Sequence, residues 1–310
     1  MEETKKINSE ETTATPYDDV HRTMLNDCPK LIIPVVNEMF HKKHSDNEKI
    51  TVLNNEFFIN RQGGSQIERI TDTHFLIGSV RYHLECQSSV DGTIMYRIFE
   101  YDSQIAMQES LLCQDKLTVK FPNTAILYLR HNQNTPDFMT VEIIVPGASC
   151  SYEVPVMKVQ TYSIDEIFKK KLFFLLPFHI FVYEKEFQEY DVDEQRLQEL
   201  AFVYQEVVQR LNSYAESGLI DEYTRLTVID MSKKVLEHLA KKYSKVREEV
   251  GAIMGGKILE YEAKDILRRG ERNHLVKLVQ KKLAKGHSVP EIADMLEEEE
   301  RVIEEIIKEL

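Results

Sequence analysis

ITDTHFLIGSVRYHLECQ, residues 70–87, contains two strand-like runs on either side of Gly78 and Ser79. Glycine at the first position of a two-residue loop favours a type II′ turn between antiparallel strands. If Gly78 and Ser79 form that turn, Ile77 pairs with Val80, and the rest of the register follows by counting outward. The stretch therefore predicts a β-hairpin with a defined set of cross-strand neighbours.

Counting outward along both strands places Asp72 opposite Glu85. Directly opposite side chains in antiparallel strands have Cβ atoms about 4.5–5.5 Å apart, and two like charges at that separation repel each other. A hard cation such as Mg²⁺ binds one or two carboxylates together with water, so the pair predicts a metal site. Gln87 lies on the same face as Glu85, where its amide is placed to hydrogen-bond a metal-bound water.

Two other interpretations of Glu85 stay open. The register could differ from this count, or Glu85 forms a structural ion pair with one of three arginines, Arg69, Arg81 or Arg97. Arg97 has two equal interpretations, since it either contacts a DNA phosphate or pairs with Glu85. The same count places His74 opposite His83, and we expect packing or phosphate contacts from these histidines rather than metal ligation.

Asp72 at the start of one strand and Glu85-Cys86-Gln87 on the next resemble the signature of the PD-(D/E)XK nucleases. The wider stretch YHLECQSSVDGTIMYRIFEYDSQIAMQESLL is similar to the Rpn family of recombination-promoting nucleases, also called PD-(D/E)XK nuclease family transposases. The resemblance extends over nearly the whole chain from Tyr17, through PYDDVHRTMLND, FPNTAILYLRHNQN, KLFFLLPFHIFVYEKEF and KLAKGHSVPEIADMLEEEERVIEEIIKEL.

The resemblance implies an α/β fold with a PD-(D/E)XK, restriction-endonuclease-like core of αβββαβ type and a mixed sheet, followed by an all-helical C-terminal region. It implies a Mg²⁺-dependent DNA endonuclease in which Mn²⁺ is a possible substitute and no nucleotide cofactor takes part. Asp72, Glu85 and Gln87 would be catalytic, and the metal ligands would be Asp72, Glu85 and the backbone carbonyl of Cys86. Arg97, on the predicted helix just after the site, is the candidate substrate contact if it does not pair with Glu85.

Two positions depart from the family's pattern. Gln87 stands where the superfamily usually has Lys, so it offers a hydrogen bond without a positive charge, and more of the activation would have to come from the metal. His21 stands where we expect an aromatic residue such as Phe. On the opposed-carboxylate interpretation, Asp72→Ala or Glu85→Ala abolishes cleavage and leaves the metal-free protein no less stable, because repulsion is relieved.

The pattern along the 310 residues changes from mixed to helical near Asp191. Residues 92–112 have helical periodicity, with Ile94, Ile98, Ile105 and Leu112 near one face. We predict a disordered tail over 1–16, a nuclease domain over 17–190, a helical linker region over 191–270 and a small helical interaction module over 271–310. In that module Ser288 and Glu291 form a predicted capping box, and its many apolar residues predict a homo-oligomer.

The net charge of −13 is unevenly distributed. Residues 231–290 carry 15 Lys and Arg against 7 Asp and Glu, whereas residues 291–310 carry 2 against 9. The basic segment is interpreted either as a solvated helix that pairs with the acidic end or as a nucleic-acid footprint. No apolar run reaches the roughly 18 residues of a membrane span, and the four dispersed cysteines are typical of reduced thiols in a cytoplasmic protein without a zinc site.

Together these features predict a cytoplasmic metal-dependent DNA endonuclease that is tied to recombination, mobile elements or phage defence. DNA is the expected partner, and no membrane contact is expected. The alternative is a noncatalytic interaction protein that retains the nuclease fold. Gln87 and the acidic charge balance favour that alternative, and the presence of both Asp72 and Glu85 counts against it.

Overall fold

The computed structural model describes residues 16–53, 56–60, 66–70, 73–90 and 92–255, together with parts of 275–309. For 56–60, 66–70 and some residues of the last two helices it describes the backbone alone. The tail predicted over 1–16, except Pro16, lies outside the described residues, as does Asp72.

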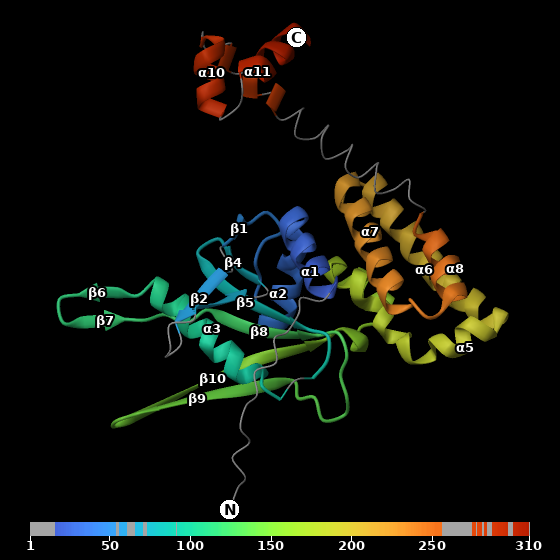
Figure 1. Cartoon of the computed structure of the whole chain (residues 1–310), viewed down its shortest axis with the longest axis horizontal. Coiled ribbons are helices and arrows are strands. Elements are labelled where there is room, and N and C mark those ends of the chain that lie inside the picture. Colours follow the sequence, from blue (N-terminus) through green and yellow to red (C-terminus); the bar gives the residue numbers. More distant parts are fainter. Residues whose placement is uncertain are drawn as a thin grey trace, which may run out of the picture.

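A six-stranded mixed sheet forms the centre of the fold, in the order β1-β4-β5-β8-β10-β9 (Figure 1). The neighbours β5, β8 and β10 run parallel, and the other three pairs are antiparallel. The strands are β1 (Ile50–Val52), β4 (Thr73–Ile77), β5 (Val80–Gln87), β8 (Asn123–Tyr128), β9 (Phe138–Val145) and β10 (Ala148–Lys158). Two further hairpins pair β2 (Glu56–Asn60) with β3 (Gln66–Ile70) and β6 (Leu111–Cys113) with β7 (Lys116–Thr118).

Helical segments from the beginning and the middle of the described chain cover one face of the sheet. Apolar residues at helical spacing in α1 (Pro16–Asp27) and α2 (Ile32–Phe40) pack on inward residues of β4, β5 and β8. The same core includes the apolar segment η3 (Phe173–Val182), whose 3-10 turns contain Pro177. The other short elements here are η1 (Pro29–Leu31), η2 (Val159–Thr161), α4 (Ile164–Lys169), η4 (Glu184–Glu186) and α5 (Phe187–Val192).

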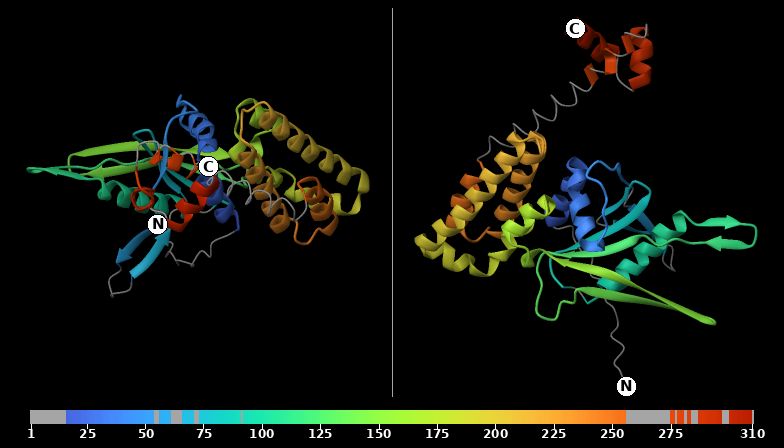
Figure 2. Two further views of the ribbon diagram at one scale, coloured as in Figure 1. Left: turned by 90° about the horizontal axis from the view of Figure 1, so that it is seen from above. Right: turned by 180° about the vertical axis from the view of Figure 1, so that it is seen from behind.

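In the described residues, the opposite face of the sheet is packed by one helix, α3 (Ile94–Gln108), which connects β5 to β6 (Figure 2). Ile94 and Ile98 form a smaller core with Ile126, Tyr128 and Val154. The helical pattern predicted for 92–112 is therefore confirmed for most of its length. Its last part is wrong, because Leu112 belongs to strand β6 and is 74% exposed.

The chain after Asp193 is helical in the described residues, as predicted. Helices α6 (Glu194–Glu216), α7 (Glu222–Leu239) and α8 (Ser244–Ile253) add their apolar faces to the core that contains α1 and η3. Breaks occur at Gly218 and Gly255, both with positive φ. The predicted boundary at 190 therefore divides a continuous core, since Tyr190 and Leu197 belong to one cluster. No helix among the described residues has the length and apolar character needed to cross a membrane.

Near the C-terminus, α10 (Val289–Leu296) and α11 (Glu300–Glu309) pack on each other. Their cluster buries Val279, Ile292, Ala293, Ile303 and Ile306. Glu291 Oε2 accepts hydrogen bonds from the backbone N–H and the hydroxyl of Ser288, both at 2.8 Å, which confirms the predicted contact of the capping box. The described residues of this module form a core of their own without a second copy. Self-association of the module therefore stays a prediction.

Candidate functional site

The predicted hairpin register is confirmed wherever the structure describes both strands. Ile77 pairs with Val80 and His74 with His83, and the ladder reaches Thr73 opposite Leu84. The hydroxyl of Thr73 also donates a hydrogen bond to the Leu84 carbonyl at 2.8 Å. Asp72 lies outside the described residues, so its pairing with Glu85 stays a prediction.

Alternation along β5 directs its side chains to two different environments. Tyr82, Leu84 and Cys86 enter the large core on the α1 side. Glu85 points to the α3 side and is buried, with 3% of its surface exposed. A buried carboxylate is costly unless it is paired and hydrogen-bonded, so the neighbours of Glu85 decide how it is stabilised.

Three neighbours contact the Glu85 carboxylate. Arg97 Nη2, from α3, donates to Oε1 at 2.9 Å, and Gln87 Nε2 donates to the same oxygen at 3.2 Å. His83 Nε2 lies 3.5 Å from Oε2, an ion-pair distance longer than a good hydrogen bond. Oε2 has no hydrogen-bond partner among the described residues. The structure thus shows the Arg97 ion pair that the sequence left as one of two interpretations.

His83 is fully buried and held by a second carboxylate. Its Nδ1 lies 2.8 Å from Asp102 Oδ1, which also accepts a hydrogen bond from the Thr124 hydroxyl at 2.7 Å. Burial by itself would lower the pKa of His83, but the hydrogen bond to Asp102 and the negative charges of Asp102 and Glu85 outweigh burial and raise it to about 10. His83 is therefore an imidazolium that bridges two buried carboxylates at neutral pH.

The four ionised groups balance one another in charge. Two cations, Arg97 and His83, stand against two anions, Glu85 and Asp102. This arrangement changes the sequence-based expectation for Glu85→Ala. Removing the carboxylate would leave the buried His83 and the partly buried Arg97 without one of their partners, which destabilises a fold, instead of relieving repulsion.

Gln87 lies beside Glu85 at the carboxyl end of β5. Its Nε2 donates to the Cys86 carbonyl at 3.0 Å as well as to Glu85. The carbonyl predicted as a metal ligand therefore already accepts one hydrogen bond, although a carbonyl oxygen has two lone pairs. The Gln87 amide links both predicted ligand groups on this strand.

Whether a metal ion fits here depends on the donor atoms that these residues offer. In the described part of the chain, Glu85 presents one oxygen without a hydrogen bond, and Cys86 presents a carbonyl that accepts from the Gln87 amide. Among the described residues there is no cluster of three His, Cys, Asp or Glu suited to a metal ion. One carboxylate and one carbonyl suit the hard-oxygen preference of Mg²⁺, and with the predicted Asp72 they fit an ion that keeps several waters.

The two predicted cross-strand histidines have separate roles. His74 Nε2 contacts Arg81 Nη1 at 3.0 Å, and Arg81 forms an ion pair with Glu109. His83 instead contacts the carboxylates of Asp102 and Glu85. Their position is confirmed, and a phosphate contact stays a prediction.

Asp102 and Thr124 were not identified from the sequence. A signal was present, because Asp102 lies on the same helical stripe as Ile94, Ile98 and Ile105, which are all buried. A carboxylate within an apolar stripe must meet a buried partner. The partner itself, His83 on a different strand, is supplied by the packing of α3 on the sheet.

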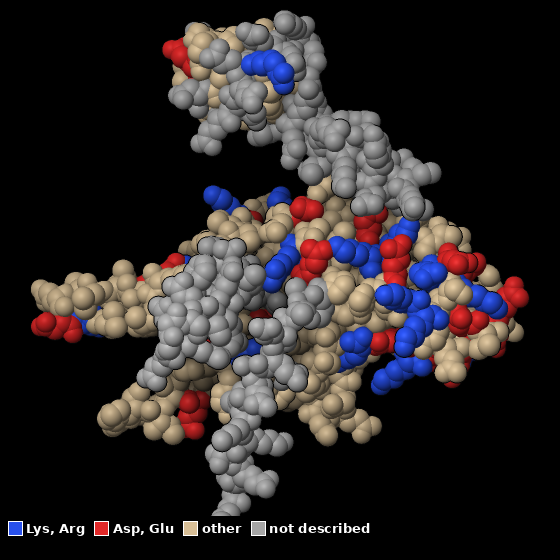
Figure 3. All heavy atoms as spheres, in the orientation of Figure 1, with Lys and Arg blue, Asp and Glu red and all other residues tan. Residues whose placement is uncertain are grey.

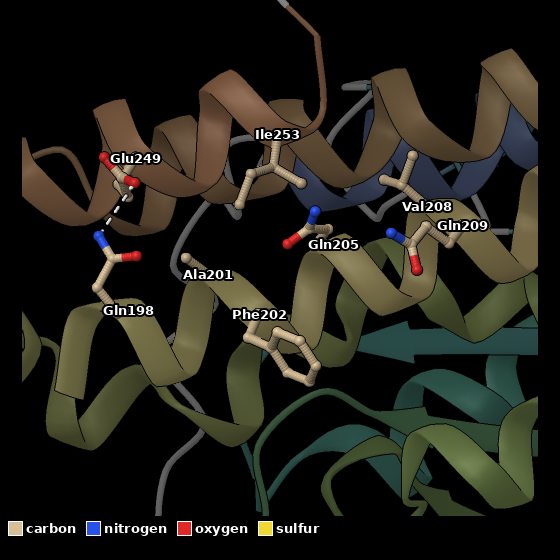
Figure 4. A pocket seen from close by; sticks show the side chains of 8 residues that line it. All are labelled: Gln198, Ala201, Phe202, Gln205, Val208, Gln209, Glu249 and Ile253. Atoms are coloured by element: carbon tan, nitrogen blue, oxygen red, sulfur yellow. Dashed lines mark hydrogen bonds between the residues drawn. The ribbon is translucent and has the colours of Figure 1, made fainter. Parts of the chain in front are cut away.

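A groove in the described residues lies elsewhere, between α6 and α8 (Figure 4). It has a volume of about 590 Å³, and glutamines line much of it, with Gln198 donating to Glu249 at 3.3 Å. A second hollow of about 460 Å³ includes His131, Lys158 and Lys185. Neither includes a predicted site residue, so the candidate site rests on side-chain geometry.

Comparisons with known proteins identify no relative of this chain. No family model, curated protein or solved structure matches the chain.

Proposed function

We propose that this protein is a Mg²⁺-dependent endonuclease that hydrolyses DNA phosphodiester bonds, with Asp72, Glu85 and Gln87 at its centre. The observation that carries the proposal is the place of Glu85-Cys86-Gln87 in the fold. The segment ends β5, the third strand of the antiparallel β1-β4-β5 meander, and β8 lies parallel beside it after the α3 crossover. With α1 and α2 in front, and with the β2–β3 and β6–β7 hairpins left aside, this order is consistent with the αβββαβ core that the family resemblance implies.

The chain's own residues would orient the acidic group. Arg97 and His83 hold the Glu85 carboxylate from two sides, and the Gln87 amide connects it to the Cys86 carbonyl. The ion would be held by Asp72, Glu85 and that carbonyl, with Mn²⁺ as a possible substitute. A bound Mg²⁺ would supply an activated water and stabilise charge on the phosphate. A role in recombination, mobile elements or phage defence belongs to the same proposal.

The test is nicking of supercoiled plasmid by the purified chain with Mg²⁺, with Mn²⁺ and with a chelator. We expect cleavage that needs the ion and that Asp72→Asn or Glu85→Gln abolishes. Gln87→Ala should slow it by roughly 10- to 100-fold, the range of a lost water-positioning group. The matched control is Glu153→Gln, which removes an exposed acid of the same sheet. Equal nicking by the wild type and Asp72→Asn would sink the proposal.

A second candidate function is a noncatalytic interaction protein built on the same fold. The charge balance of the described network favours it. In that network the negative charges of Glu85 and Asp102 are matched by the positive charges of Arg97 and His83 without a metal. Calorimetric titration with Mg²⁺ separates the two. An endonuclease should bind the ion and lose that binding in Glu85→Gln, whereas a scaffold should bind none and cleave nothing while remaining folded.

A further inference from the structure

Exposed apolar side chains gather on one part of the molecule. Of the sixteen large apolar side chains that are exposed in the described residues, twelve lie between Val90 and Val145. This part includes α3 and the projecting β6–β7 and β9–β10 hairpins, which extend from the same side of the sheet in all three ribbon views (Figures 1 and 2). A concentration of exposed apolar side chains of this kind is typical of an interaction surface.

Strand β9 is the longest strand of this surface with an open edge. It forms the edge of the six-stranded sheet and pairs only with β10 among the described residues. The strand is eight residues long, FMTVEIIV, and Glu142 is its one charged residue. Natural sheets usually blunt such an edge with charges, proline or a short strand, because an open edge pairs with other chains.

The ladder shows which residues face the open edge. The backbone N–H of Val156 donates to the Asp137 carbonyl at 2.9 Å, which makes this opposed couple a hydrogen-bonded pair. Such pairs alternate along antiparallel strands, so odd-numbered residues of β9 bond to β10. Even-numbered residues therefore direct their N–H and C=O groups outward, as Thr140 and Glu142 do.

We propose that β9 pairs antiparallel with β9 of a second copy of this chain, about a twofold axis at Val141. The two sheets would then form one continuous sheet with both α3 helices on the same side. This interface is independent of the proposed nuclease activity and separate from the C-terminal module predicted to self-associate.

A second copy is the occupant because the strand is complementary to itself in this register. Val141 meets Val141, and Met139 meets Ile143 on the α3 face. On the other face Phe138 meets Ile144, and Glu142 lies opposite Thr140, which offers a hydroxyl. No like charges oppose each other, and the partly buried Met139 and Val141 that pack on the α3 core would continue into the partner's.

The neighbouring registers are unfavourable. A twofold axis perpendicular to the sheet pairs residues that lie on the same face of both copies. The alternative registers are therefore those in which the axis passes through another residue of β9. An axis at Glu142 opposes two carboxylates, which is destabilising. An axis at Thr140 places Glu142 against Phe138 and Asp137 against Ile143, so each charge faces an apolar side chain. The axis at Val141 is therefore preferred.

The charge of this surface disfavours nucleic acid as the occupant. Between Glu109 and Pro155 the sequence has five acids and three Lys or Arg. In the view of Figure 3 the two hairpins are mostly uncharged, and Lys and Arg gather over the helical part with α6–α8. Nucleic-acid surfaces need clustered basic residues, and this one lacks them.

Disulfide trapping tests the register in the full chain carrying Cys113→Ser and Cys150→Ser, because both natural cysteines are exposed. At the proposed axis the two Val141 residues form a non-hydrogen-bonded pair with Cα atoms about 4.5 Å apart, within disulfide range. Val141→Cys should cross-link under mild oxidation. Ile143→Cys is the matched control, because its two copies would lie about 13 Å apart. Cross-linking of both variants or of neither overturns the proposal.

Light scattering with a charge exchange tests the interface without a cross-link. Thr140→Glu sets a new carboxylate opposite Glu142 twice in the dimer and should weaken association by roughly 10-fold. Adding Glu142→Lys in the same chain restores opposite charges and should recover most of the loss. A wild type that stays monomeric at high concentration, or a double variant no better than Thr140→Glu, overturns the proposal. Circular dichroism confirms that each variant is folded.

Discussion

Two buried histidines show how neighbours decide the charge of one side-chain type. His83 contacts two carboxylates, and its pKa is raised to about 10. The His21 ring packs at 5.2 Å from the ring of Phe174, and neither ring nitrogen has a hydrogen-bond partner among the described residues. Burial, aided by the charge of Arg22, lowers the pKa of His21 to about 3. His21 therefore occupies an aromatic environment, consistent with the expectation of Phe there.

Replacing His21 by Phe should stabilise the protein. A buried polar group without a partner costs about 1–3 kcal/mol, so we expect the free energy of unfolding to rise by about 1 kcal/mol at neutral pH. The folded-state pKa is below the unfolded one, so wild-type stability is lost as pH falls from 6.5 toward 3. The gain should therefore grow in acid. Urea denaturation at pH 7 and pH 5 measures it, and a smaller gain at pH 5 would contradict the assignment.

His83 should show the opposite pH dependence. Its folded-state pKa is raised, so the stability that its charge contributes is complete below about pH 6.5 and is lost as pH rises through about 10. The difference in unfolding free energy between the wild type and His83→Gln should shrink over that interval. Denaturant melts at several pH values between 6 and 10 test this. A constant difference would show that the imidazole is neutral throughout.

At the scale of elements, the Gly78-Ser79 turn connects β4 to β5 and sets their register. Gly78 has φ of +59°, and its N–H donates to the Lys49 carbonyl at 2.9 Å. A Cβ at this position would lie 3.2 Å from Glu48 Oε2. Both the backbone conformation and the space therefore favour glycine, as the sequence predicted from turn chemistry alone.

Gly78→Ala should lower the free energy of unfolding by about 1–2 kcal/mol, the cost of a left-handed conformation for a residue with a Cβ. Ser79→Ala, next in the same turn, is the control and should change little. Thermal or urea denaturation of the three proteins provides the measurement. Equal stability of wild type and Gly78→Ala would mean that the turn relaxes to another conformation.

At the scale of the whole molecule, the large core joins regions that are distant in sequence. Residues of α1 pack with residues of η3 and α7, and Tyr17 lies 5.0 Å from Phe181 and 5.2 Å from His238, ring to ring. The helices after 191 thus help to build the sheet domain. The cluster around Ile292 and Ile303 is formed separately by the C-terminal residues.

A chain that ends at Gly270 should therefore unfold at the same denaturant concentration as the full chain, because the large core is retained. Light scattering of both forms also separates the two association surfaces. If β9 pairs between copies, the truncated chain still dimerises. The full chain should form a larger assembly only if the C-terminal module self-associates as predicted. A truncated chain that unfolds much earlier would show that the two clusters are coupled.

The sequence by itself determined the local features that depend on neighbours along the chain. Turn chemistry at Gly78 sets the β4–β5 register, alternation separates Glu85 from Cys86, and the capping residues Ser288 and Glu291 mark the start of α10. Local patterns specify such features because each depends on residues within a few positions. The prediction that the helix extends to Leu112 is wrong, because Leu112 keeps the helical spacing and yet lies in a strand.

Only the tertiary structure decided what lies around Glu85. The crossover of α3 brings Arg97 and Asp102 over β5, and the parallel pairing of β8 brings Thr124 beside His83. These contacts join residues 12 to 22 positions apart, and no periodicity encodes which helix face meets which strand. The sequence predicts that the Glu85 carboxylate is repelled by Asp72. In the structure it pairs with two cations, because packing supplies partners that spacing along the chain does not reveal.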